Sequence, residues 1–349
     1  FVQFYGNLIE TNKRRNRGDM EYELLDTGIF NGDRYFDIFV EYAKQTPEDI
    51  LIEISVCNRG PEPATLHVLP TLWFRNIWTW WPGTPKPVLK QSTGSKGSQA
   101  VAASHTLLGE RYLYCEGDVP LLFTENETNN ERIFGTPNAG PYVKDGINAY
   151  VVGGKQDAVN PQNTGPRAAA HYQVDVGAEK PATIRLRLSD MAPAVLRDPF
   201  DSFAEIMQAR QREADEFYHA ITPERVSKDG ALVMRQALAG MLWSKQYFGF
   251  DVDKWLEEHG VDPLQPGGKQ IRNREWFHMV NNHIISMPDK WEYPWYAAWD
   301  LAFHTLALSA FDPDFAKKKL DLMLSGVYLH PSGQIHAYER TFSDVNQPV

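Results

Sequence analysis

The hydrophobic and polar positions follow two different periods along the chain, and the change lies near residue 195. Between residues 35 and 188, short apolar segments alternate with polar positions or carry β-branched residues, and Gly, Pro and Asn separate them. These features predict β-strands. Many short strands without a helical pattern between them indicate an antiparallel β-sandwich, which we assign to residues 1–195. The expected strands are residues 35–42, 50–57, 65–73, 111–115, 120–124, 171–176 and 182–188.

Two segments in this half are rich in turn-forming residues. Residues 83–103 contain many Pro, Lys, Gly and Ser, and residues 135–167 are broken in the same way apart from a short apolar run at 149–152. Such composition predicts long exposed loops at both places.

After Asp198 the apolar positions recur with the period of a helix. Residues 199–218 place Phe200, Phe203, Ile206 and Met207 on one face, which predicts an amphipathic helix. Ser227 is a favourable N-cap for a second helix over residues 228–248. Two further helices are expected over residues 301–310 and 313–326. We therefore assign residues 196–349 to a helical domain.

Composition narrows the class of partner. The net charge is −10, which argues against a nucleic acid or an anionic membrane as partner. No apolar run approaches the roughly 20 residues that a membrane helix needs. The two cysteines, Cys57 and Cys115, form no disulfide framework or metal motif, which favours a reducing compartment and a cytoplasmic location. We expect no cofactor, and the oligomeric state is not indicated.

Aromatic residues are the unusual part of the composition. They make up 12% of the chain and include ten tryptophans, several of them clustered within residues 73–81. The apolar C–H face of a sugar ring stacks on aromatic side chains, so this content suits a carbohydrate-acting protein. The alternative is that the aromatics simply supply buried area in the core.

The strongest single candidate for a catalytic group is Asp300. It follows a long polar and aromatic connection, residues 251–299, and stands where a helix is expected to begin, next to Trp299 and near Trp295 and Tyr296. Nearby aromatics would raise the pKa of its carboxyl, as a general acid requires, whereas the helix dipole favours the charged form. An Asp at this position is also a common helix cap. The residues alone leave both interpretations open.

Five segments resemble a known family. They are residues 10–15 (ETNKRR), 21–30 (EYELLDTGIF), 67–76 (HVLPTLWFRN), 295–303 (WYAAWDLAF) and 333–339 (GQIHAYE). Together they resemble the bacterial branch of glycoside hydrolase family 63, which is related to oligosaccharide-processing glucosidases and to mannosylglycerate hydrolases. The resemblance extends over nearly the whole chain. It implies an N-terminal β-sandwich followed by an (α/α)6 barrel, and glycoside hydrolysis with inversion.

The resemblance also implies roles for individual residues. Asp300 matches the general acid of the family, whose general base is a Glu late in the barrel. Four helices are expected here against the twelve of a full barrel, so the base is expected beyond Val349. The chain, which begins at Phe1 without a methionine, is expected to be a truncated fragment that does not hydrolyse efficiently alone.

Further residues are expected to contact substrate or to shape the site: Trp295, Tyr296, Trp299, Gln334, Tyr338 and Glu339. Glu339 is a minor local candidate for the base, and Arg340 and Thr341 follow it where relatives are expected to carry Trp and Asn. No metal site is predicted, because His278, His283 and His304 lack tight ligand spacing.

Two other functions remain open. One is a non-catalytic carbohydrate-binding or scaffolding module that stacks sugars on tryptophan. The other is a different enzyme on the same helical toroid, such as a trehalase-like hydrolase or a phosphorylase.

Overall fold

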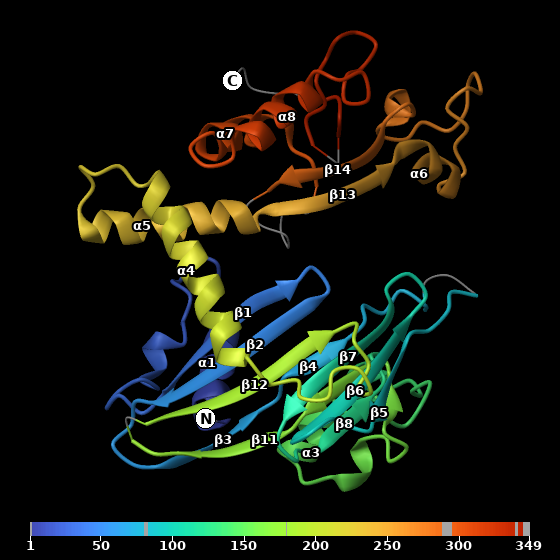
Figure 1. Ribbon diagram of the computed structural model, residues 1–349. Helices are drawn as coiled ribbons and strands as arrows, with labels where there is room; N and C mark the ends of the chain where they lie inside the picture. Colours follow the sequence, from blue (N-terminus) through green and yellow to red (C-terminus); the bar gives the residue numbers. More distant parts are fainter. Residues whose placement is uncertain (1, 80–82, 179, 288–294, 339–340, 345–349) are drawn as a thin grey trace. The chain divides into compact units, whose positions relative to one another are not determined.

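The computed structural model describes residues 2–79, 83–178, 180–287, 295–338 and 341–344 (Figure 1). The chain forms two compact units, Phe1–Arg212 (unit 1) and Glu213–Val349 (unit 2). The boundary lies inside helix α4 (Phe203–Ile221), later than the division at residue 195 that the change of period suggests.

Unit 1 is built mainly from antiparallel strands. Its largest sheet has seven strands in the order β1-β2-β12-β7-β6-β5-β9, and two smaller sheets have the orders β4-β10-β8 and β11-β3. The strands of the large sheet are β1 (Phe36–Thr46), β2 (Asp49–Asn58), β12 (Pro181–Ser189), β7 (Gly109–Glu116), β6 (Ser98–His105), β5 (Val88–Ser92) and β9 (Thr164–Gly165). Those of the small sheets are β4 (Thr71–Trp73), β10 (Arg167–Ala170), β8 (Leu121–Thr124), β11 (Tyr172–Val176) and β3 (Ala64–Val68).

One apolar core holds these sheets together. Alternate side chains of the large sheet, such as Val56, Leu89 and Leu186, meet Phe123 of β8 and Val176 of β11 in a single buried cluster. The apolar residues that predicted the strands therefore point into this core, and the polar residues between them point to the opposite face of each sheet. The seven expected strands are confirmed, although the sequence over residues 65–73 is divided between β3 and β4.

A buried ion pair lies at the end of the large sheet. Arg187 of β12 donates two hydrogen bonds to Asp49 of β2, with Nε–Oδ1 and Nη2–Oδ2 distances of 2.9 and 2.6 Å. A third hydrogen bond from Arg187 reaches the carbonyl oxygen of Pro199 at 2.9 Å. Both side chains are almost completely buried, so each charge depends on the other for compensation.

The expected loop at residues 83–103 is wrong, because β5 and β6 form there. Leu89 and Val101 fill the core from these strands, and the Gly- and Ser-rich part is only the turn between them. Gly94 is required in this turn, since a Cβ atom there would lie 1.8 Å from the carbonyl oxygen of Ser98. The expected loop at 135–167 likewise contains ordered elements, among them α3 (Gly146–Val151), η2 (Gln156–Ala158) and β9.

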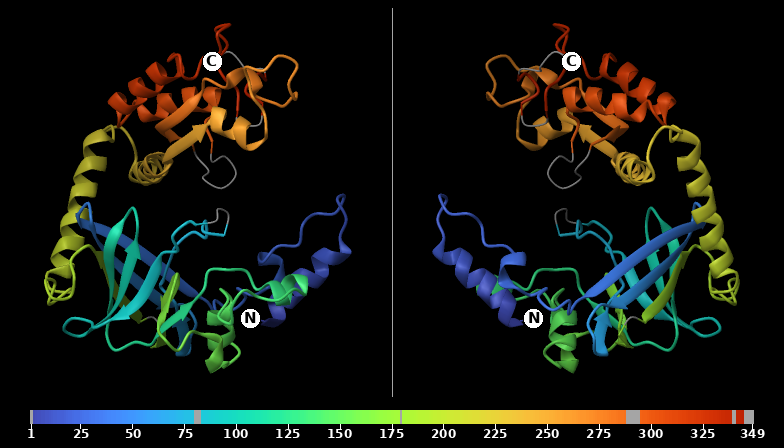
Figure 2. Two further views of the ribbon diagram at one scale, coloured as in Figure 1. Left: turned by 90° about the vertical axis from the view of Figure 1, so that its right-hand side faces the viewer. Right: turned by 90° about the vertical axis from the view of Figure 1, so that its left-hand side faces the viewer.

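Short helices complete unit 1. They are α1 (Val2–Arg14), which the strand and helix patterns did not predict, α2 (Asn130–Phe134) and the single turn η1 (Leu25–Thr27). The two views in Figure 2 show these helices outside the strands. None of them contributes to the main core cluster of unit 1.

Unit 2 combines helices with a pair of antiparallel strands. Helix α5 (Lys228–Trp243) begins as expected, with the Ser227 hydroxyl accepting a hydrogen bond from the Gly230 N–H at 3.1 Å. It ends earlier than the expected residue 248, because β13 (Lys245–Asp251) follows and pairs with β14 (Val280–Ser286). The remaining elements are α6 (Val252–Glu258), η3 (Arg274–Trp276), α7 (Ala298–Leu308) and α8 (Pro313–Met323).

Helices α7 and α8 lie side by side against this strand pair (Figures 1 and 2). They bury Leu301 and Met323 together with Phe248, Trp276 and Tyr328 in the second core cluster. The connection expected over residues 251–299 therefore contains α6, η3 and β14. The chain as a whole is a mixed β and α protein.

Candidate functional site

The segment before α7 is anchored by one buried ring. Tyr296 is fully buried and stacks on Tyr328, with ring centroids 4.2 Å apart. Its other neighbour is His336, with a centroid distance of 4.6 Å. Its hydroxyl group is buried and has no hydrogen-bond partner among the described residues, and burial raises the pKa of this phenol well above its usual value. The ring therefore fixes the position from which α7 begins.

The first turn of α7 presents Trp299 and Asp300. The N-cap is Ala297, whose side chain makes no capping hydrogen bond, so Asp300 is the third residue inside the helix and does not cap it. Trp299 is 41% exposed and contacts Phe303 edge to face, with ring centroids 6.0 Å apart. In the described part of the chain, the half-buried Asp300 carboxylate has neither a hydrogen-bond nor an ion-pair partner. The first turn of α7 thus carries an unpartnered carboxylate and, one residue before it, an exposed indole.

A hydrogen bond from His304 connects helix α7 to strand β14. The Nδ1 atom of His304 lies 2.8 Å from the carbonyl oxygen of Ser286, the last residue of β14. Thr305, one residue further on, is buried and donates to the carbonyl oxygen of Ala302 at 2.6 Å. The face of α7 toward β14 is therefore fixed, while Trp299 and Phe303 remain exposed.

The loop that carries Gln334 and Tyr338 is organised around His336. This imidazole is buried, and the desolvation lowers its pKa to about 3, although a hydrogen bond with the backbone of Tyr296 acts in the opposite direction. Gln334 is exposed and its Nε2 atom lies 3.4 Å from the carbonyl oxygen of Asp344. The Tyr338 hydroxyl donates to Oδ2 of Asp344 at 3.0 Å. Glu339 lies outside the described residues.

The contact of Tyr296 with His336 brings two of the expected site segments together. His336 stands two residues from both Gln334 and Tyr338, and Tyr296 stands four residues before Asp300. Trp295 is half-buried against the same core. Asp300 itself makes no hydrogen bond with Gln334 or Tyr338 within the part of the chain that is described. The two segments thus meet through Tyr296 and His336 in the core, and no hydrogen bond among the described residues joins Asp300 to Gln334 or Tyr338.

Two residues of this arrangement, Tyr328 and His336, were absent from the expected site. His336 lies within the GQIHAYE segment, but no alternation marks it, because His336 and the adjacent Ala337 are both buried while Gln334 is exposed. Tyr328 carries no local pattern either.

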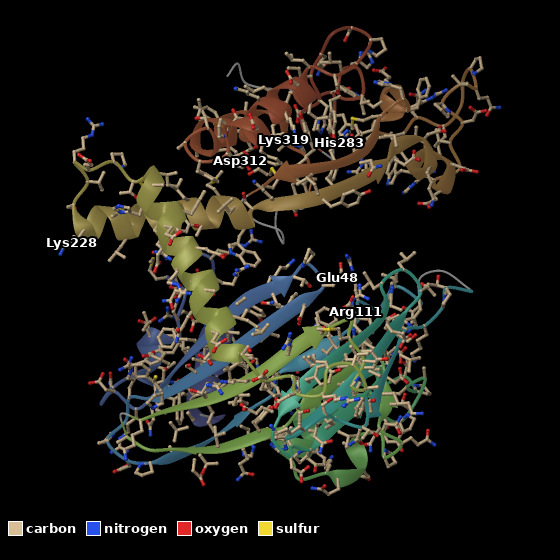
Figure 3. All side chains as sticks on the ribbon, viewed as in Figure 1. Glu48, Arg111, Lys228, His283, Asp312 and Lys319 are labelled. Atoms are coloured by element: carbon tan, nitrogen blue, oxygen red, sulfur yellow. The ribbon has the colours of Figure 1, made fainter. Side chains whose placement is uncertain are left out.

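A second group of polar residues continues from Tyr328 into the interior of unit 2. The Tyr328 hydroxyl lies 3.1 Å from Nδ1 of His283, and Lys319 donates a hydrogen bond to the carbonyl oxygen of the adjacent Ile284. Burial lowers the pKa of Lys319, with a smaller contribution from Lys318. Burial and then the charge of Lys319 lower the pKa of His283. The hydrogen bond from Lys319 thereby connects α8 to β14, and the pKa values of both Lys319 and His283 are lowered at this contact (Figure 3).

An ion pair accompanies this group. Lys245 at the start of β13 pairs with Asp312, the N-cap of α8, and also lies over the ring of Phe315 at 4.4 Å from its centroid. The positive charge lowers the pKa of the Asp312 carboxyl through their hydrogen bond. Figure 3 shows Asp312, Lys319 and His283 in unit 2; the Glu48–Arg111 pair belongs to unit 1.

Neither a metal centre nor a membrane span is found in the described parts of the chain. Within residues 2–79, 83–178, 180–287, 295–338 and 341–344, no three His, Cys, Asp or Glu side chains are grouped in a way that could hold a metal ion. In the same ranges no helix is both long and apolar enough to cross a membrane.

Comparison with known proteins gives one sequence relative. No family model matches the chain. An uncharacterized protein of Saccharomyces cerevisiae is 35% identical over an alignment that covers 99% of this chain and 36% of the yeast protein. The chain therefore spans about a third of the length of this relative.

Solved structures show only weak similarity. A polysaccharide lyase aligns with 48% of this chain and 22% of its own, at 11% identity and a TM-score of 0.30. A putative kojibiose phosphorylase from the human microbiome aligns with 88% of this chain and 36% of its own, at 13% identity and a TM-score of 0.25. Both names are those of carbohydrate-active enzymes, and the TM-scores are too low to assign a fold.

Proposed function

We propose that this chain is part of an inverting glycoside hydrolase of the glucosidase type, in which Asp300 is the general acid. One observation supports this most directly: the Asp300 carboxylate lies in the first turn of α7, one residue after the exposed Trp299, without a partner among the described residues. The resemblance of residues 295–303 to glycoside hydrolase family 63 assigns the same role to this position. The helix-cap alternative is weakened, because Ala297 occupies the N-cap.

In the proposed reaction Asp300 donates a proton to the glycosidic oxygen as the bond to the anomeric carbon breaks. A second carboxylate removes a proton from a water molecule that attacks the opposite face of the sugar ring. The two carboxyl groups of an inverting enzyme stand about 6.5–9.5 Å apart, which leaves room for this water. We place the second carboxylate outside these 349 residues, in keeping with the greater length of the yeast relative.

Other residues have distinct proposed roles. Trp299 offers an exposed ring for stacking against a sugar, and Trp295, Gln334, Tyr338 and Glu339 are proposed to shape or line the site. Tyr296 is fully buried in unit 2, so we assign it a positioning role rather than a contact with substrate. It acts by holding the start of α7 against His336.

The proposal includes the wider organisation. Residues 1–195 would form the β-sandwich domain, and residues 196–349 would form the N-terminal part of an (α/α)6 barrel that continues in a longer protein. The two free cysteines, Cys57 and Cys115, support a cytoplasmic location. The substrate is an oligosaccharide or a small glycoside, and no cofactor is required for this chemistry.

The test uses the longer protein that contains this chain. Replacing Asp300→Asn removes the transferable proton at nearly constant size, so we expect kcat on an unactivated glucoside to fall by about 10²–10⁴-fold. A glucosyl fluoride needs little acid assistance, so its hydrolysis should fall far less. Asp314→Asn is the matched control, since Asp314 lies in the first turn of α8.

Two results would contradict the proposal. Near-normal turnover of the unactivated glucoside by Asp300→Asn would exclude the general-acid role. Binding of oligosaccharide without turnover by the unaltered longer protein would favour the non-catalytic carbohydrate-binding alternative.

A further inference from the structure

The row of residues at the end of the three-stranded sheet in unit 1 combines an aromatic ring with a cation. The register of the sheet sets Arg167 of β10 opposite Trp73 of β4 on one side and opposite Thr124 of β8 on the other. Residues directly opposite in antiparallel strands point to the same face of a sheet. Trp73 and Arg167 are therefore neighbours on one face, and Trp73 is 54% exposed.

The two faces of this sheet are used differently. Leu72, Phe123 and Ala168 point to the main core of unit 1. The opposite face is covered at one end, where Leu122 and Ala169 pack against Ile147 of α3. At the end formed by Trp73 and Arg167 the same face borders a pocket of about 660 Å³. Its volume lies in the range of small-molecule sites, roughly 300–1,000 Å³.

The walls of this pocket are held by hydrogen bonds between two loops. The Asn126 amide donates to the carbonyl oxygen of Phe74 at 2.8 Å, and the Asn76 amide donates to the carbonyl oxygen of Asn126 at 3.4 Å. The Phe74 N–H donates to the carbonyl oxygen of Pro166 at 3.2 Å, which ties the end of β4 to the start of β10. Asn76 and Asn126 both line the pocket, so their amides are presented from a fixed backbone.

The charge of the lining is positive, although the chain has a net charge of −10. Lys144 and Arg167 line the pocket, and none of its described lining residues is acidic. Arg167 donates from Nη1 to the carbonyl oxygen of Lys144 at 3.0 Å. Its Nε atom is buried and has no hydrogen-bond partner in the part of the chain described. A buried donor without a partner is costly, so this guanidinium is not fully satisfied by the described protein atoms.

Two carboxylates next to lining residues in the sequence, those of Glu127 and Asp145, already have partners. Glu127 accepts a hydrogen bond from the Trp78 indole at 2.9 Å and lies 3.6 Å from Lys86. Asp145 pairs with Arg132 at 3.1 Å. Lys144 and Arg167 therefore remain available to an anion that enters the pocket.

We propose that this pocket binds an acidic sugar, a pyranose unit that carries a carboxylate. The exposed ring of Trp73 stacks on the apolar face of the pyranose, Arg167 and Lys144 bind the carboxylate, and the amides of Asn76 and Asn126 bind ring hydroxyls. The site lies entirely in unit 1 and does not depend on Asp300. It is a binding site and takes no part in bond cleavage.

The test is isothermal titration calorimetry on the whole 349-residue chain. The probe is a galacturonic acid trisaccharide, and maltotriose is the neutral comparison. We expect the acidic trisaccharide to bind at least tenfold more tightly than maltotriose. The affinity for the acidic trisaccharide should fall as salt is added, because the contact to the carboxylate is ionic.

Variants separate the parts of the site. Trp73→Ala should weaken binding of the acidic trisaccharide at least tenfold, and Lys144→Gln should weaken it and reduce its salt dependence. Trp243→Ala is the matched control, because Trp243 is an exposed tryptophan of unit 2, and binding should be unchanged. Circular dichroism of each variant should match that of the unaltered chain.

Three results would overturn the proposal: no binding of the acidic trisaccharide at millimolar concentration, equal binding of maltotriose, or unchanged binding in Trp73→Ala. Asp300→Asn should leave this binding unaffected. A failure here is therefore distinct from a failure of the proposed hydrolase.

Discussion

The ring of Tyr296 lies against the imidazole of His336, with centroids 4.6 Å apart and ring planes inclined by 33°. Tyr296 lies two residues before α7, and His336 is a buried residue of the loop that carries Gln334 and Tyr338. The position of Asp300 in the first turn of α7 therefore depends on a loop 36 residues further along the chain. Changes in either ring should alter the site through the core of unit 2.

The first prediction concerns the pH dependence of stability. The pKa of His336 is lowered by burial from 6.5 to about 3. Between these values the unfolded state binds a proton that the folded state does not, so stability falls as the pH drops below 6.5. At pH 5 this loss is about 2 kcal/mol relative to pH 7.5, at 1.36 kcal/mol for each pH unit below 6.5.

Substituting His336→Phe should remove this part of the pH dependence. Urea unfolding at pH 7.5 and pH 5 measures it, and the difference between the two pH values should shrink by about 2 kcal/mol. His219→Phe, at an exposed position of α4, is the control and should retain the difference. An unchanged difference in His336→Phe would show that this imidazole is not the acid-sensitive group.

The second prediction separates the ring of Tyr296 from its hydroxyl. The hydroxyl is buried without a hydrogen-bond partner among the described residues. Tyr296→Phe should therefore leave the free energy of unfolding unchanged or raise it by up to about 1 kcal/mol. Tyr296→Ala should lower it by about 3–5 kcal/mol, because it leaves a cavity between Tyr328 and His336. A loss of more than about 2 kcal/mol in the Phe variant would mean that the hydroxyl has a partner.

The third prediction concerns the buried pair of Arg187 and Asp49 in unit 1. Removing the cation with Arg187→Met leaves the Asp49 charge buried and uncompensated, so the free energy of unfolding should fall by about 3–5 kcal/mol. The double variant Asp49→Leu with Arg187→Met should recover most of this loss. Arg34→Met, in the exposed pair with Glu62, is the control and should cost less than about 1 kcal/mol. Equal losses at the two arginines would be inconsistent with a buried ion pair.

The fourth prediction is a stabilising substitution in unit 2. Asn281 of β14 lies on the inner face opposite Phe250, and neither polar atom of its buried amide has a hydrogen-bond partner among the described residues. Asn281→Leu should raise the free energy of unfolding by about 1–2 kcal/mol, as measured by urea unfolding. Asn282→Leu is the control on the exposed face and should bring no gain, because it removes the acceptor of the Tyr247 hydroxyl. A loss in Asn281→Leu would show that the amide is satisfied.

Elements whose hydrophobic pattern is local are predictable from the amino-acid order alone. The strands around Ile54 and Leu186 alternate with period two, and the helix after Ser227 starts at a capping hydroxyl, so both are visible without a structure. The same sequence indicates Asp300 as a candidate, by its aromatic neighbours and by family resemblance. What Asp300 does remains a prediction.

Elements that depend on distant partners are visible only once the chain is folded. The sequence of residues 83–103 predicts a loop because it is rich in Pro, Lys, Gly and Ser, yet Leu89 and Val101 pack in a core to which other strands contribute. The sequence predicts that residues 245–248 end the second helix, and they belong instead to β13 because β14 pairs with them. The contacts of Tyr296 with His336 and of Trp73 with Arg167 join segments 40 and 94 residues apart. No local period records such contacts, because side-chain packing across that distance is set by the fold.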